Sequence, residues 1–120
     1  METKLPLSTR LAFIGCGVMA ESMVAGLLRQ EIVGAKQIVA SHPRVDRRAE
    51  LTERHGIECF EDNADAVRGL PDDSVVLLCV KPQRMGNVLK ELAGVVRSTQ
   101  LVVSIVAGAR IEKIAESLSN

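Results

Sequence analysis

Residues 11–20 read LAFIGCGVMA, an apolar run that leads into a glycine-rich turn and then into a helical pattern. The run Leu11–Ile14 has the length and composition of a buried strand. From residue 18 to residue 30 the apolar residues recur at helical spacing, which places Met19 on the expected apolar face. A G-x-G-x-x-A motif between a strand and a helix is typical of sites that bind the pyrophosphate of a dinucleotide.

Each small residue of this motif has a physical role in such a site. Gly15 allows the tight turn, and Gly17 lets the backbone approach a pyrophosphate with no side chain in the way. Ala20 lets the helix pack closely on the strand. The start of the helix offers N–H groups and a partial positive charge to the phosphates. A glycine turn without a ligand is the alternative, and the strand and helix around the motif disfavour it.

The rest of the chain alternates strand and helix patterns. Strands are expected at 37–41, 57–60, 74–80 and 101–106. Helices are expected at 43–55, 62–67, 84–96 and 110–118. Asp62 or Asn63 can cap the helix at 62–67. The strand at 74–80 is apolar throughout, as expected when both faces are covered. Right-handed crossovers between such strands predict an α/β, Rossmann-like, doubly wound and mostly parallel sheet. Such sheets usually have a sixth strand, so we expect this one to be truncated after about five.

The end of the second predicted strand bears on the choice between NAD and NADP. Residues 40–44 read ASHPR, whereas NAD enzymes usually place an acidic residue here to bind the ribose 2′-hydroxyl. Ser41 and His42 can donate hydrogen bonds, and Arg44 can pair with a 2′-phosphate. We therefore expect NADP, with NADPH preferred over NADH. Two alternatives stay open: His42 as an ordinary loop residue, and Arg44, Arg47 and Arg48 as a solvated helix face with Asp46 and Glu50.

Two further strand ends lie at the same predicted edge of the sheet. Lys81 can hydrogen-bond a ribose or lend positive charge, and Pro82 fixes the chain as it turns away, although a lysine here can equally be a surface residue. Residues 104–108 read SIVAG, and these small residues either leave room for a flat ring or form an ordinary turn. Asn63 is either a helix cap or a cofactor contact.

The composition excludes several classes of function. The 120 residues carry 15 basic and 15 acidic side chains, and this balance argues against a nucleic acid or a membrane surface as partner. No apolar run approaches the roughly 20 residues of a membrane span, and residues 1–10 lack a signal-peptide core, so we expect a cytoplasmic protein. The three cysteines and two histidines lack metal-ligand spacing, and no hydrolytic triad is evident. Catalytic residues are therefore not predicted.

Five segments together resemble pyrroline-5-carboxylate reductase, which uses NAD(P)H to make L-proline from 1-pyrroline-5-carboxylate. They are residues 14–20 (IGCGVMA), 40–44 (ASHPR), 61–63 (EDN), 80–83 (VKPQ) and 104–108 (SIVAG). Their order and spacing are similar to those of the family's N-terminal domain over nearly the whole chain. The pair of VKPQ and S-x-x-A-G is the most specific part of the resemblance, and the glycine motif is the least specific.

The resemblance implies a role for each of these segments. The pyrophosphate would be held by Ile14, Gly15, Cys16, Gly17, Val18 and Met19, with Val18 standing where the family often has a polar residue. Ser41, His42 and Arg44 would contact the adenosine ribose and its phosphate, and Asn63 would also contact the cofactor. The nicotinamide end would be lined by Cys79, Val80, Lys81, Pro82, Val106, Ala107 and Gly108.

The family's C-terminal helical domain, which forms the dimer and the substrate pocket, is not in this chain. We therefore expect residues 1–120 to be an NAD(P)-binding domain that binds NADP(H) but has little or no reductase activity alone, and the full-length protein to be a homo-oligomer. One alternative is the cofactor domain of another NADP-dependent reductase of the same superfamily, such as a deazaflavin-dependent one. The other is a stand-alone NADP(H)-sensing module.

Overall fold

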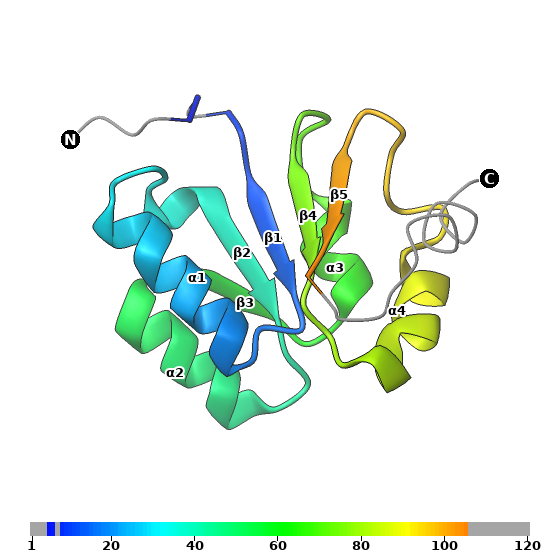
Figure 1. Cartoon of the computed structure of the whole chain (residues 1–120), viewed down its shortest axis with the longest axis horizontal. Coiled ribbons are helices and arrows are strands. Elements are labelled where there is room, and N and C mark those ends of the chain that lie inside the picture. The colour runs from blue at the N-terminus through cyan, green and yellow to red at the C-terminus, as the bar shows by residue number, and fades with distance from the viewer. Residues whose placement is uncertain (1–4, 7, 106–120) are drawn as a thin grey trace.

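The computed structural model describes residues 5, 6 and 8–105, which form a parallel sheet of five strands between two layers of helices (Figure 1). The strands are β1 (Leu11–Ile14), β2 (Ile38–Ser41), β3 (Glu58–Phe60), β4 (Val75–Leu78) and β5 (Leu101–Ser104). Their order in the sheet is β3-β2-β1-β4-β5, and every neighbouring pair is parallel. This topology confirms the predicted Rossmann-like α/β fold.

Helices α1 (Val18–Arg29) and α2 (Val45–His55) cover one face of the sheet, and α3 (Asn63–Arg68) and α4 (Met85–Leu92) cover the other (Figure 1). Two short 3-10 helices, η1 (Ala35–Gln37) and η2 (Pro82–Arg84), lie in the connections. The helix predicted at 110–118 lies outside the described residues. No helix in the described part of the chain is long and apolar enough to span a membrane.

The core lies on both faces of β1, the central strand. Leu11 and Phe13 pack with the apolar residues of α1 and α2, whereas Ala12 and Ile14 pack with those of α3 and α4. All four side chains are buried, which explains why this strand reads as a continuous apolar run rather than as an alternating one. In register, Ile14 lies beside Ser41 of β2 and Leu78 of β4, so these three strands end at the same edge.

The orientation of α1 differs from the prediction for its first turn. Met19 was expected on the apolar face, but its side chain is 67% exposed. Ala20 and Val24, one helical turn apart, are buried against the sheet instead. The small side chain of Ala20 brings the helix close to the sheet, and this contact turns Met19 outward.

The helix predicted at 84–96 ends earlier, at Leu92. Ala93 has an extended backbone, and Gly94 follows with a φ of 81°, a left-handed conformation that ends the helix. Val95 and Val96 still pack against the core, but from a loop. The apolar pattern past Gly94 predicts a helix, but loop residues can bury the same kinds of side chain as helix residues. Val95 and Val96 do so here.

Candidate functional site

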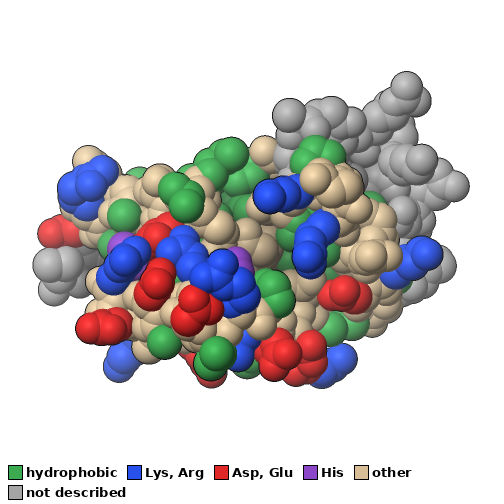
Figure 2. All heavy atoms as spheres, turned by 90° about the horizontal axis from the view of Figure 1, so that it is seen from below, with side chains coloured by type: hydrophobic (Ala, Val, Ile, Leu, Met, Phe, Trp, Pro, Cys, Tyr) green, Lys and Arg blue, Asp and Glu red, His purple; other side chains and the backbone are tan. Residues whose placement is uncertain are grey.

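β1 and β4 are neighbours in the sheet, and the connections that leave their carboxyl ends run in opposite directions. From β1 the chain crosses to β2 on one side, and from β4 it crosses to β5 on the other. In open α/β sheets, ligands bind outside the strand ends at such a switch point. Figure 2 looks onto this edge and shows charged side chains gathered beside exposed apolar ones.

Gly15 makes the turn out of β1. Its φ is 83°, and a Cβ on it would lie 2.5 Å from Cγ1 of Val80, in the segment after β4. The next residue ties the turn to the neighbouring strand, because the N–H of Cys16 donates to the carbonyl of Ser41 at 2.8 Å. Glycine is therefore required here for two reasons, the left-handed backbone and the contact across the switch point.

Gly17 leaves the N-terminus of α1 open. It is the N-cap residue, it offers no side chain to the first-turn N–H groups, and a Cβ on it would meet nothing within 4 Å. Val18 beside it is 79% exposed. The first turn of α1 thus has no side-chain cap, and its N–H groups and the positive end of the helix dipole are available to an anion.

Ser41 and Asn63, both predicted cofactor contacts, bond to each other inside the protein. The hydroxyl of Ser41, which is fully buried, accepts from the N–H of Gly15 at 3.0 Å and donates to Oδ1 of Asn63 at 2.6 Å. Nδ2 of Asn63 donates to Glu91 of α4 at 2.8 Å. Asn63 begins α3 and Asp62 is its N-cap residue, so the interpretation of Asn63 as the cap is wrong. Glu91 belongs to no motif, so sequence reasoning missed it.

The loop after β2 is held by three hydrogen bonds around His42. The N–H of His42 donates to the carbonyl of Phe60 at 3.0 Å, and Nδ1 of His42 accepts from the N–H of Arg44 at 3.1 Å. The guanidinium of Arg48 donates to the carbonyl of His42 at 2.8 Å. Burial above all, followed by the charges of Arg47 and Arg44, lowers the pKa of His42. The loop is thus held in surroundings that disfavour a positive imidazole at His42.

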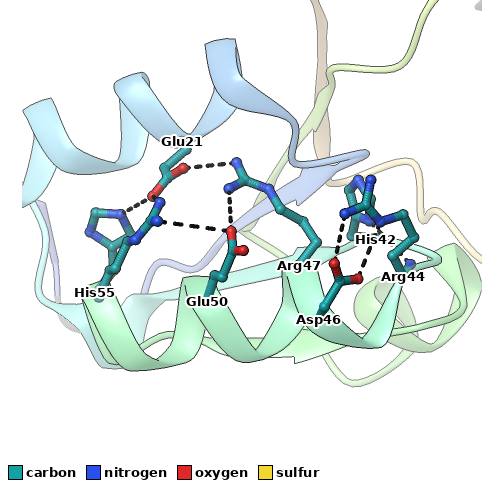
Figure 3. Close-up of polar contacts among 8 residues, drawn as sticks. Glu21, His42, Arg44, Asp46, Arg47, Glu50 and His55 are labelled. Carbon is teal, nitrogen blue, oxygen red and sulfur yellow. Dashed lines mark hydrogen bonds and ion pairs between the residues drawn. The ribbon is translucent and has the colours of Figure 1, made fainter.

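Arg44 and Arg47 have different surroundings (Figure 3). Arg44 pairs with Asp46 at 2.7 Å, and its side chain is 68% exposed. That pair holds the pKa of Asp46 at about 2. Arg47 is only 12% exposed and contacts Glu21 at 2.8 Å and Glu50 at 3.2 Å. Of the alternative solvated helix face, the structure contains the Arg44–Asp46 and Arg47–Glu50 pairs. Arg47, however, is mostly buried and also contacts α1, and Arg48 donates to the loop.

Glu21 is the centre of the contact between α1 and α2. Its carboxylate contacts His55 at 2.8 Å and Arg47 at 2.8 Å (Figure 3). It also contacts Arg54 at 3.3 Å. The hydrogen bond with His55, with those from the two arginines, lowers the pKa of Glu21 to about 2. Three side chains of α2 share this one carboxylate of α1. The cluster therefore holds α1, whose N-cap residue is Gly17, against α2.

The segment after β4 borders the other side of the switch point. Cys79 and Val80 are half-buried, whereas Lys81, the N-cap residue of η2, and Pro82, its first residue, are exposed. Burial raises the pKa of Cys79 to about 12, so its thiol is a neutral lining group. Val106, Ala107 and Gly108 lie outside the described residues. Among the residues that are described, no group of His, Cys, Asp or Glu could hold a metal ion.

Comparisons with known proteins agree with this arrangement. Residues 10–108 match the family model described as NADP oxidoreductase, coenzyme F420-dependent. The chain is 46% identical over 99 residues to the pyrroline-5-carboxylate reductase of Pseudomonas aeruginosa, a match that covers 82% of this chain and 35% of that protein. The chain thus spans about a third of the length of that relative.

Solved structures show the same likeness. That of a pyrroline-5-carboxylate reductase from Coxiella burnetii has a TM-score of 0.84 at 28% identity, covering 94% of this chain and 41% of that one. The Plasmodium falciparum pyrroline carboxylate reductase, solved with NADP bound, has a TM-score of 0.75 at 22% identity, covering 92% of this chain and 38% of that one. The second likeness shows the fold alone.

Proposed function

The chain belongs to the family of coenzyme F420-dependent NADP oxidoreductases, and from this membership we propose that it is the NADP(H)-binding part of a pyrroline-5-carboxylate reductase. In that reaction the nicotinamide supplies a hydride that reduces 1-pyrroline-5-carboxylate to L-proline. The protein's task is to hold and orient the cofactor against the substrate.

The observation that carries this proposal is the paired geometry of Gly15 and Gly17. Gly15 brings the turn against Val80, and Gly17 leaves open space over the N-terminus of α1. The first-turn N–H groups and the helix dipole would hold the pyrophosphate there. In this proposal Ile14 to Met19 form the phosphate-binding turn, with backbone rather than side-chain contacts at Val18.

We place the adenosine 2′-phosphate at the loop after β2. His42 and Arg44 would contact it, while Arg48 holds the loop through the carbonyl of His42. Arg44 is exposed and would exchange its partner Asp46 for the phosphate. NADH lacks this phosphate, so the same arrangement supports a preference for NADPH.

The nicotinamide would lie against Cys79, Val80, Lys81 and Pro82, and the resemblance to the family adds Val106, Ala107 and Gly108 to this lining. Lys81 ends the segment as an exposed cation and would bind the ribose or its neighbouring phosphate. Substrate contacts and the dimer interface would come from the part of the relatives that this chain does not span. We therefore expect little turnover by the 120-residue chain alone.

A second candidate is a reductase that exchanges a hydride between NADP(H) and a deazaflavin, because the family's description names coenzyme F420. The 46% identity to a pyrroline-5-carboxylate reductase favours the first candidate. Both share the NADP(H) site proposed here.

Calorimetric titration of the chain with NADPH and with NADH tests the proposal. We expect NADPH to bind more tightly, and Arg44→Ala to weaken NADPH roughly fivefold, the upper range for an exposed charge pair, while leaving NADH unchanged. Arg29→Ala, in the last turn of α1, removes the same charge far from the site and should change neither. Failure of both nucleotides to bind would overturn the proposed function, and equal binding of the two would overturn the preference for NADPH.

A further inference from the structure

We propose that Glu91 of α4 is a positioning residue for the nucleotide site, acting through Asn63 and Ser41 on the backbone amide of Gly15. The three bonds run without a break from the surface to the glycine turn. Glu91 accepts from Asn63 at 2.8 Å, Asn63 accepts from Ser41 at 2.6 Å, and Ser41 accepts from the Gly15 N–H at 3.0 Å. The relay joins α4, α3, β2 and the turn after β1.

The chemistry of Glu91 sets the direction of every bond in this relay. An ionised carboxylate only accepts hydrogen bonds, so the NH₂ end of the Asn63 amide must face it. The amide oxygen then faces Ser41, and the hydroxyl of Ser41 must donate to that oxygen. The lone pairs of Ser41 are left for the Gly15 N–H, which is a donor.

Without an acceptor at position 91, the amide of Asn63 can turn over. Its NH₂ end would then face Ser41, which would have to accept from two donors, and the hydroxyl proton of this buried residue would need another partner. The N–H of Gly15 would share its acceptor with Asn63. Glu91 therefore holds the turn in one arrangement, although its side chain lies on the surface.

This inference rests on the proposed function for its effect on NADPH, but the relay itself is measurable without nucleotide. Three variants separate its causes. Glu91→Ala removes the charge and the acceptor, Glu91→Gln removes the charge alone, and Glu53→Ala removes a similar exposed charge from α2. In ¹⁵N–¹H spectra of the nucleotide-free chain, we expect the Gly15 amide proton to shift upfield in Glu91→Ala and to stay near its original position in the other two.

NADPH titration of the same variants supplies the second measurement. Glu91→Ala should raise the Kd about three- to tenfold, the range for losing one hydrogen bond of a relay, and Glu91→Gln should raise it less. Electrostatics alone predicts the opposite, because removing a negative charge favours an anionic ligand equally in both variants. Tighter or equal binding by both would therefore overturn the positioning role.

A Ser41→Ala background makes the test independent of general stability. Once Ser41 no longer links Asn63 to Gly15, adding Glu91→Ala should cause no further change in the Gly15 shift or in NADPH affinity. Additive effects in the double variant would overturn the relay. If no variant binds NADPH but the Gly15 shifts follow the pattern, the relay stands and the proposed function fails.

Discussion

Gly15 and Val80 lie so close across the switch point that a side chain at position 15 would force one of them to move: a Cβ there would lie 2.5 Å from Cγ1 and 3.3 Å from Cα of Val80. Gly17, two residues later, has only open space around the same position. The two glycines of the motif therefore differ: Gly15 is needed for the turn itself, whereas Gly17 leaves the space that we propose for the pyrophosphate.

Replacing each glycine by alanine should separate these two roles. Gly15→Ala forces a left-handed backbone and an overlap with Val80, so we expect a loss of about 2–4 kcal/mol in the free energy of unfolding, with weaker NADPH binding. Gly17→Ala should cost less than about 1 kcal/mol but weaken NADPH binding at least as much, because its methyl group enters the space over α1. Urea unfolding and NADPH titration measure both. Equal destabilisation by the two variants would contradict the different roles.

The Glu21 cluster should give the protein an acid-sensitive contact between α1 and α2. The pKa of Glu21 is about 2 in the folded chain, against an ordinary 4.5. The stability that the ionised carboxylate contributes is therefore present above pH 4.5 and is lost as the pH falls toward 2. We expect Glu21→Gln to be less stable than the original chain at pH 6 and the gap to close between pH 4.5 and 2. Denaturant unfolding across this range measures it, and the exposed Glu53→Gln is the matched control. A gap that is independent of pH would argue against the cluster.

His42 should report the 2′-phosphate directly. In the nucleotide-free chain its pKa lies below the ordinary 6.5, because of burial first and of Arg47 and Arg44 next. A bound 2′-phosphate would favour the charged imidazole and raise this pKa, so NADPH should bind more tightly as the pH falls through it. NADH, without the phosphate, should leave it unchanged. Proton NMR of the His42 ring follows both titrations, and equal shifts with the two nucleotides would place the phosphate elsewhere.

The cysteines beside the site should be unreactive. Burial above all raises the pKa of both Cys16 and Cys79 to about 12, so near pH 8 only about one thiol in 10,000 is ionised. We expect iodoacetamide to label neither residue appreciably in the folded chain and to label both at ordinary rates in urea. Mass spectrometry of peptides resolves the sites. Rapid labelling of folded Cys79 would show that its surroundings are more open than the structure has them.

The strands and the glycine turn were predictable because local sequence determines them. β1 was placed without error, and the helix after it begins at Val18 as expected, since Gly17 separates an apolar run from a helical repeat. β4 ends at Leu78 rather than at residue 80, because Val80 turns away to meet Gly15. Composition alone cannot distinguish the last residues of a strand from apolar residues that pack in a loop.

The polar contacts of the site depend on distant residues and were not predictable in detail. Ser41 was expected to face the cofactor, yet its hydroxyl is buried between Gly15 and Asn63. Glu91 carries no local signal, since it lies on the polar side of a short helix and acquires its role only from the packing of α4 beside α3. Whether Ser41, His42, Arg44 and Asn63 contact NADP(H) stays a prediction.

β1 precedes both of its neighbours, β2 and β4, in the chain, and it lies between them in the sheet. β1 can pair with β2 once residue 41 has been made, but its other neighbour, β4, is complete only at residue 78. During that interval one edge of β1 has no partner, and the apolar side chains of Ala12 and Ile14 lack the cover that α3 and α4 later provide. An open, apolar edge is a template for wrong pairing between chains. We expect nascent chains of intermediate length to be those that aggregate or engage chaperones, and completion of β4 to end this vulnerability.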